Sequence, residues 1–170
     1  MTALIYSPWL AAYLLVLQQV LMLTVGMYRT KKKQGMGFQD DLTLERLVRR
    51  HGNLAENAGI FITSIVLLEL QVGSTRLVWV LCLAFATART LHAIGFSSAA
   101  GAYKLDSKGI GLLFLGARAL GALSTAFTGI VCGFALAIAG SIVFLMQMFV
   151  INIFGWIESL KTLKFRCKHF

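Results

Sequence analysis

Charged and apolar residues occupy separate blocks along this chain. No charged residue precedes Arg29, and the later charges gather in short stretches between apolar segments. An apolar segment of about 20 residues is long enough to cross a membrane as a helix. The pattern predicts four such helices, at 6–28, 42–70, 76–96 and 110–139, joined by a basic loop at 29–41, a turn at 71–75 and a small-residue loop at 97–109.

Residues 119–157 form an uncharged run that is too long for a single span. As one helix the run would measure about 58 Å, nearly twice the hydrocarbon core of about 30 Å. Gly140 and Ser141 offer a break, which predicts a fifth helix at 142–160. The expected units are a transmembrane four-helix domain, 1–140, and an additional hydrophobic helix with a basic tail, 141–170.

Composition excludes a soluble protein. The chain is 58% hydrophobic and only 14% charged, with a mean hydropathy of +0.76, whereas soluble domains carry about a quarter of charged residues. The net charge of +9 comes from basic residues at the ends of apolar segments, a position that reports membrane topology and not nucleic-acid binding. Cys82, Cys132 and Cys167 show no paired spacing, which argues against a disulfide framework. We therefore expect an all-α integral membrane protein.

The distribution of Lys and Arg predicts the orientation in the membrane. Cytoplasmic loops carry an excess of these residues, so the loops at 29–41 and 97–109 are expected in the cytoplasm and the N-terminus outside. A cytoplasmic tail requires a fifth span, and an interfacial helix is the alternative. The basic residues of the tail are Lys161, Lys164, Arg166 and Lys168.

Ionisable and polar residues occur inside two of the predicted spans, where they are costly and usually functional or paired. At about 100° per residue, Arg49, Asn53 and Glu56 fall on one face of the second helix. Arg89 and His92 share one side of the third helix. Both groups lie toward the predicted cytoplasmic ends of their helices, so they can meet in the bundle, for instance through a Glu56–Arg89 pair.

Arg118 lies at the same end of the fourth helix and joins this layer. Together the three helices predict a cation-rich pocket for a small anionic ligand, because arginine binds carboxylates through a bidentate fork. Snorkelling or mutually paired interfacial residues are the simpler alternative. A metal site at His51, His92 and Glu56 is disfavoured because nearby arginines repel a cation, and a channel would need polar residues across the whole bilayer.

Two runs of residues resemble a known family. The first is Arg49-x-His51-x-Asn53-x-x-Glu56, and the second is Ala88-Arg89-x-x-His92-x-x-Gly95-Phe96. With the stretch Arg118-Ala119-Leu120-Gly121-x-x-x-Thr125, they are similar to the MAPEG superfamily, the membrane-associated proteins of eicosanoid and glutathione metabolism. The likeness spans about residues 5–140 and is nearest to small bacterial inner-membrane members.

The resemblance implies a four-helix protomer in a homotrimer, with glutathione as co-substrate between neighbouring subunits near the cytoplasmic face. Arg49, Asn53 and Glu56 match the positions that hold the tripeptide, and Arg89 and His92 would line the same pocket. Arg118 matches the arginine that stabilises the glutathione thiolate.

The sequence departs from the family pattern at three positions. Asn57 and Gly59 stand where Tyr and Pro are frequent, and Phe96 offers a ring without a hydroxyl. Two hypotheses follow. The first is a glutathione-dependent membrane transferase or peroxidase acting on lipophilic electrophiles, and the second is a non-catalytic membrane binding protein that retains the fold and the pocket.

Overall fold

The structure is a computed structural model that describes residues 4–97 and 110–166, with side chains described except at 110–115 and 157–166. Most of the predicted loop at 97–109, and Cys167 and Lys168 of the tail, lie outside the described residues. The described helices are α1 (Tyr6–Lys32), α2 (Leu42–Val72), α3 (Arg76–Gly95) and α5 (Ile110–Arg166).

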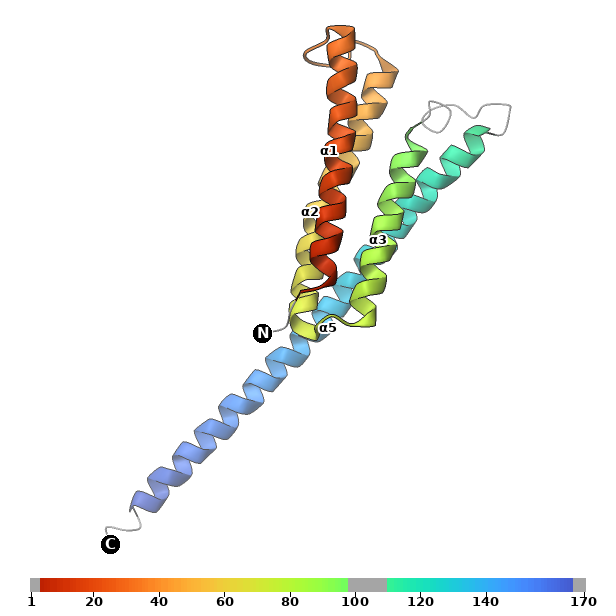
Figure 1. Cartoon of the computed structure of the whole chain (residues 1–170). Helices are drawn as coiled ribbons and strands as arrows, with labels where there is room; N and C mark the ends of the chain where they lie inside the picture. Colours follow the sequence, from red (N-terminus) through yellow and green to blue (C-terminus); the bar gives the residue numbers. More distant parts are fainter. Residues whose placement is uncertain (1–3, 98–109, 167–170) are drawn as a thin grey trace.

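Each helix begins at the residue that the charge pattern predicts, and each contains a stretch long and apolar enough to cross a membrane. The protein is therefore an integral membrane protein, and the predicted all-α transmembrane bundle is confirmed. α1 pairs with α2, and α3 packs along α5 (Figure 1). Between the pairs, the rings of Phe61 on α2 and Phe85 on α3 stack with their centroids 3.8 Å apart.

Two carboxylates join α1 to α2, one at each end of the pair. Asp41 caps the start of α2, where its carboxylate accepts from the amides of Thr43 and Leu44. Its second oxygen accepts from the hydroxyl of Tyr28, near the end of α1, at 2.9 Å. At the other end, the fully buried Glu69 accepts hydrogen bonds from the first residues of α1. The α1–α2 pair is thus tied by polar contacts outside its apolar core.

The predicted break at Gly140 and Ser141 is wrong, because both residues lie inside the continuous helix α5. A glycine in a helix interior costs only about 1 kcal/mol relative to alanine. The hydroxyl of Ser141 donates to the carbonyl of Ala137 one turn earlier, at 2.9 Å, and so does not compete with the helix. The additional hydrophobic segment is present as a straight continuation of the fourth helix.

This continuation leaves the bundle. Ala139 is buried, whereas every described side chain from 141 to 156 is exposed, and α5 ends on the side away from the α1–α2 loop (Figure 1). The prediction that the tail and this loop share one side is therefore wrong, because it required the chain to turn back at Gly140. Which side is cytoplasmic stays a prediction.

Candidate functional site

Arg89 lies at the centre of a polar layer between α2, α3 and α5, and its side chain is 3% exposed. Its Nη2 donates to the backbone carbonyl of Asn53 at 2.9 Å, and its Nη1 donates to Oγ1 of Thr125 at 3.2 Å. Its Nε has no hydrogen-bond partner among the described residues. The carbonyl of Asn53 also accepts from the side-chain amide of Asn57, at 2.8 Å. Arg89 is therefore a buried cation whose donors are only partly used.

Two glycines bring α3 and α5 into backbone contact at this level. A Cβ atom added at Gly95 would lie 2.5 Å from the backbone nitrogen of Arg118. A Cβ added at Gly121 would lie 2.6 Å from the backbone nitrogen of His92 and 2.7 Å from the carbonyl of Ala88. No side chain fits in either place without a shift of the helices. The two glycines thus set the separation of His92 and Arg118.

One aromatic ring contacts both His92 and Arg118. The ring of His92 packs on that of Phe96, with centroids 4.9 Å apart. The Cζ atom of Arg118 lies 5.2 Å from the centroid of the Phe96 ring, close enough for a cation–π interaction. The ring of Phe96 therefore supports the guanidinium of Arg118 through its face, although it lacks a hydroxyl.

The structure separates the predicted site residues into two groups. Arg89, His92 and Arg118 come together with the backbone of Asn53, as described above. Arg49 is exposed, and its Nε lies 3.6 Å from Oε1 of Glu45 on its own helix. Glu56 is also exposed.

The predicted Glu56–Arg89 ion pair is not formed in the described chain, because Arg89 turns to the Asn53 carbonyl and to Thr125. Arg49 and Glu56 instead lie on the face of α2 that this single chain leaves uncovered. Their predicted role in binding stays a prediction.

Sequence reasoning missed two polar residues of this region. Thr125 was predicted only as part of a motif, although its spacing of seven residues from Arg118 places both on one face of α5. Arg46 is 9% exposed, and its Nη1 donates to the carbonyl of Ser97 just beyond α3, at 3.0 Å. The acceptor of Arg46 is a backbone atom, so no pattern of side chains in the sequence could have predicted the contact.

The arrangement has the chemistry of an anion site. Guanidinium groups from two helices, Arg89 and Arg118, are held near His92 at the end of the bundle where α3 ends and the α1–α2 loop lies (Figure 1). Among the described residues, no group of three His, Cys, Asp or Glu side chains is placed to hold a metal ion. Two guanidinium groups close together favour an anionic ligand or a developing negative charge.

Comparison with known proteins gives one match. The family model described as MAPEG family matches residues 7–156, which is most of the chain. No curated protein and no solved structure matches.

Proposed function

The chain belongs to the MAPEG family, and from that premise we propose that it binds glutathione and transfers it to lipophilic electrophiles, or uses it to reduce lipophilic hydroperoxides. Members of this family have glutathione-related transferase or peroxidase functions in membranes. The observation that carries the proposal for this chain is the buried Arg89 near His92 and Arg118. Among the described residues, the guanidinium of Arg89 donates to a carbonyl and a hydroxyl and not to a carboxylate. A buried cation whose hydrogen-bond partners are neutral is costly, so its retention favours a role with an anion.

The proposed roles follow from position. Arg118 stabilises the glutathione thiolate, because a cation beside a thiol lowers the pKa of that thiol from about 8.5. The thiol proton leaves to water. In the transfer reaction the thiolate sulfur forms a C–S bond as the leaving group of the electrophile departs with its electron pair. In the peroxidase reaction the thiolate attacks the hydroperoxide, the O–O bond breaks and the alcohol leaves, and a second glutathione reacts with the resulting sulfenic acid to give the disulfide and water. The face of the Phe96 ring supports the guanidinium of Arg118, and Arg89 and His92 line the pocket.

The tripeptide is held, in this proposal, between subunits of a homotrimer. Arg49 and Glu56 are exposed on α2, and Asn53 between them is half-buried. A neighbouring copy that covers this face would enclose the three side chains together with Arg89, His92 and Arg118, which we call the Arg89 cluster. Mass measurement in mild detergent should give a trimer, and a monomer under all mild conditions would contradict a shared site.

Thiolate formation tests the proposal directly. Adding glutathione to the purified protein should produce the ultraviolet absorbance of a thiolate, and Arg118→Leu should abolish it and lower kcat/KM by roughly 100-fold, as loss of one electrostatic stabiliser does. The matched control is Lys31→Leu, an exposed cation in the last turn of α1. Full absorbance in Arg118→Leu would show that the assigned role is wrong.

A non-catalytic binding protein is the second candidate. Phe96 has no hydroxyl, and Asn57 and Gly59 replace residues frequent in the family, so the pocket could be kept without the chemistry. Binding of glutathione without thiolate absorbance, and without turnover of a panel of electrophiles and hydroperoxides, would favour this candidate.

A further inference from the structure

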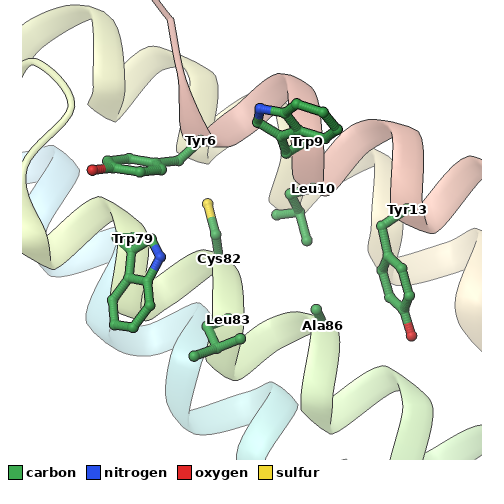
Figure 2. A pocket seen from close by; sticks show the side chains of 8 residues that line it. All are labelled: Tyr6, Trp9, Leu10, Tyr13, Trp79, Cys82, Leu83 and Ala86. Carbon is green, nitrogen blue, oxygen red and sulfur yellow. The ribbon is translucent and has the colours of Figure 1, made fainter.

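A groove of about 370 Å³ lies between α1 and α3, away from the Arg89 cluster (Figure 2). Four aromatic side chains line it: Tyr6, Trp9 and Tyr13 on α1, and Trp79 on α3. The remaining lining is apolar except for the thiol of Cys82, which points from α3 toward α1 (Figure 2). Ligand pockets in proteins begin at about 300 Å³, so the groove is large enough to hold part of a lipid.

One end of the groove is closed. The hydroxyls of Tyr13 on α1 and Thr90 on α3 are hydrogen-bonded to each other. This contact lies at the end of the groove toward Arg89, which directly precedes Thr90 on α3. An occupant therefore enters from the other end or from the side and does not reach the candidate glutathione pocket along this path.

The open side of the groove is exposed on helices that are apolar enough to cross a membrane. Trp9 is 77% exposed and Trp79 is 48% exposed, although both belong to helices that cross the membrane. Trp and Tyr favour the membrane–water interface, and Tyr6, Trp9 and Trp79 lie near the beginnings of α1 and α3. The groove thus runs inward from one interface, in the direction that an acyl chain follows.

The charge at this interface selects the headgroup. Arg76, the first residue of α3, is exposed and lies one turn before Trp79 on the same side of the helix. The described acidic residue at this end, Glu69, is buried and already accepts from the hydroxyls of Ser7 and Ser74 and from backbone amides. It is therefore engaged elsewhere and does not pair with Arg76.

We propose that this groove binds an anionic phospholipid, with one acyl chain between α1 and α3 and the phosphate at Arg76. The inference is independent of the proposed glutathione chemistry, because none of the residues in it belongs to the Arg89 cluster. One basic residue near an anionic headgroup contributes about 1 kcal/mol, which is about a fivefold preference over a zwitterionic lipid.

Tryptophan quenching by brominated lipids tests this site. The chain has three tryptophans, so Trp156→Phe leaves Trp9 and Trp79, both in the groove, as the only reporters. In bilayers that contain a small fraction of phospholipid with dibrominated chains, brominated phosphatidylglycerol should quench these tryptophans at about one-fifth of the mole fraction that brominated phosphatidylcholine needs. Arg76→Gln should remove this preference and keep quenching by the chains.

Ala86→Phe supplies the steric test. Ala86 lines the groove, and the next residue, Thr87, is exposed outside it. Ala86→Phe should fill the groove and abolish the preference for phosphatidylglycerol, whereas the matched Thr87→Phe should retain it. Equal quenching by both lipids in the parent protein, or an unchanged preference in Ala86→Phe, would overturn the proposal and leave only ordinary contact with bulk lipid.

Cys82 gives a second measurement that needs no substitution in the groove. In protein carrying Cys132→Ala and Cys167→Ala, phosphatidylglycerol added in detergent should slow alkylation of Cys82 by a lipophilic maleimide about fivefold more than phosphatidylcholine does. Protection that follows the oligomeric state and not the lipid would show that a second copy covers the groove, and would refute the lipid site.

Discussion

Substitution of Glu69 by glutamine should weaken the contact between α1 and α2 at one end of the pair and so lower the stability of the protein. The carboxylate accepts five hydrogen bonds: from the amides of Ile5, Tyr6 and Ser7 at 2.9 Å each, and from the hydroxyls of Ser7 and Ser74 at 2.6 Å each. In Glu69→Gln one oxygen becomes an NH2 group. A hydroxyl can rotate to accept from this group, but a backbone N–H cannot.

The expected loss can be worked from these contacts. With the remaining oxygen placed toward Ile5 and Tyr6, the new NH2 faces the amide of Ser7, so at least one backbone hydrogen bond is lost and its donor stays buried. A hydrogen bond to a charged group contributes about 1.5–3 kcal/mol, and an unsatisfied buried donor costs about 1–3 kcal/mol. Because the retained contacts also lose their charge assistance, Glu69→Gln should lower the free energy of unfolding by about 3 kcal/mol.

Reversible unfolding in mixed micelles measures this difference. Ser74→Ala, which removes one hydroxyl donor, should cost about 1 kcal/mol. Glu56→Gln, an exposed carboxylate on the same helix, should stay within about 0.5 kcal/mol of the parent. If Glu69→Gln is as stable as Glu56→Gln, the carboxylate does not hold the helix pair together and the reasoning fails.

Three further changes have defined outcomes. Gly121→Ala should cost about 1–2 kcal/mol of stability and lower glutathione turnover, because its Cβ would meet backbone atoms of α3. Gly116→Ala, whose Cβ would meet open space, should be neutral or stabilising by up to about 1 kcal/mol. Unfolding and turnover assays check both variants. Phe96→Leu should lower kcat/KM by about fivefold, since a partly buried cation–π contact contributes about 1 kcal/mol. Phe96→Tyr should keep the kcat/KM of the parent protein. Equal kcat/KM values for the parent and both variants would contradict a role for the cation–π contact. Amide and phenol hydrogen bonds lower the pKa of Asp41. The stabilisation by its carboxylate is therefore complete above the ordinary carboxyl pKa and is lost as the pH falls through the lowered value. Asp41→Asn should reduce the pH dependence of the unfolding free energy below about pH 4, and Asp40→Asn should not.

The sequence was sufficient to predict the helices and the end of the bundle where the site lies. Apolar blocks bounded by charges determine where helices can cross a membrane, and each helix begins at the predicted residue. The meeting of Arg89, His92 and Arg118 also followed from their placement near the same end of two helices. These features depend on local composition and helical periodicity, both of which are visible in one sequence.

Features that depend on backbone partners were not predictable. Glu69 lies in an apolar stretch between Leu68 and Leu70, but its partners are amides of α1 more than 60 residues away. Arg89 was expected to find a carboxylate and instead finds the carbonyl of Asn53. The prediction of a helix break at Gly140 was wrong because it depended on the length of the apolar run relative to a bilayer. That length does not by itself cause the chain to turn at a given residue.

The polar contacts of the site also join the two helix pairs, which determines how the site should be tested. Arg89 on α3 donates to the α2 backbone, and Arg46 on α2 donates to the carbonyl of Ser97 beyond α3. Removing either arginine would remove a hydrogen bond between the two helix pairs and so mix a folding defect with a binding defect. Arg118 is on α5, half-buried, and packs on the ring of Phe96, so its replacement leaves both hydrogen bonds between the pairs intact. If Arg118→Leu unfolds at the same denaturant concentration as the parent while thiolate absorbance is lost, the loss reports chemistry; a parallel loss of stability would make the arginine a structural residue and remove it from the mechanism.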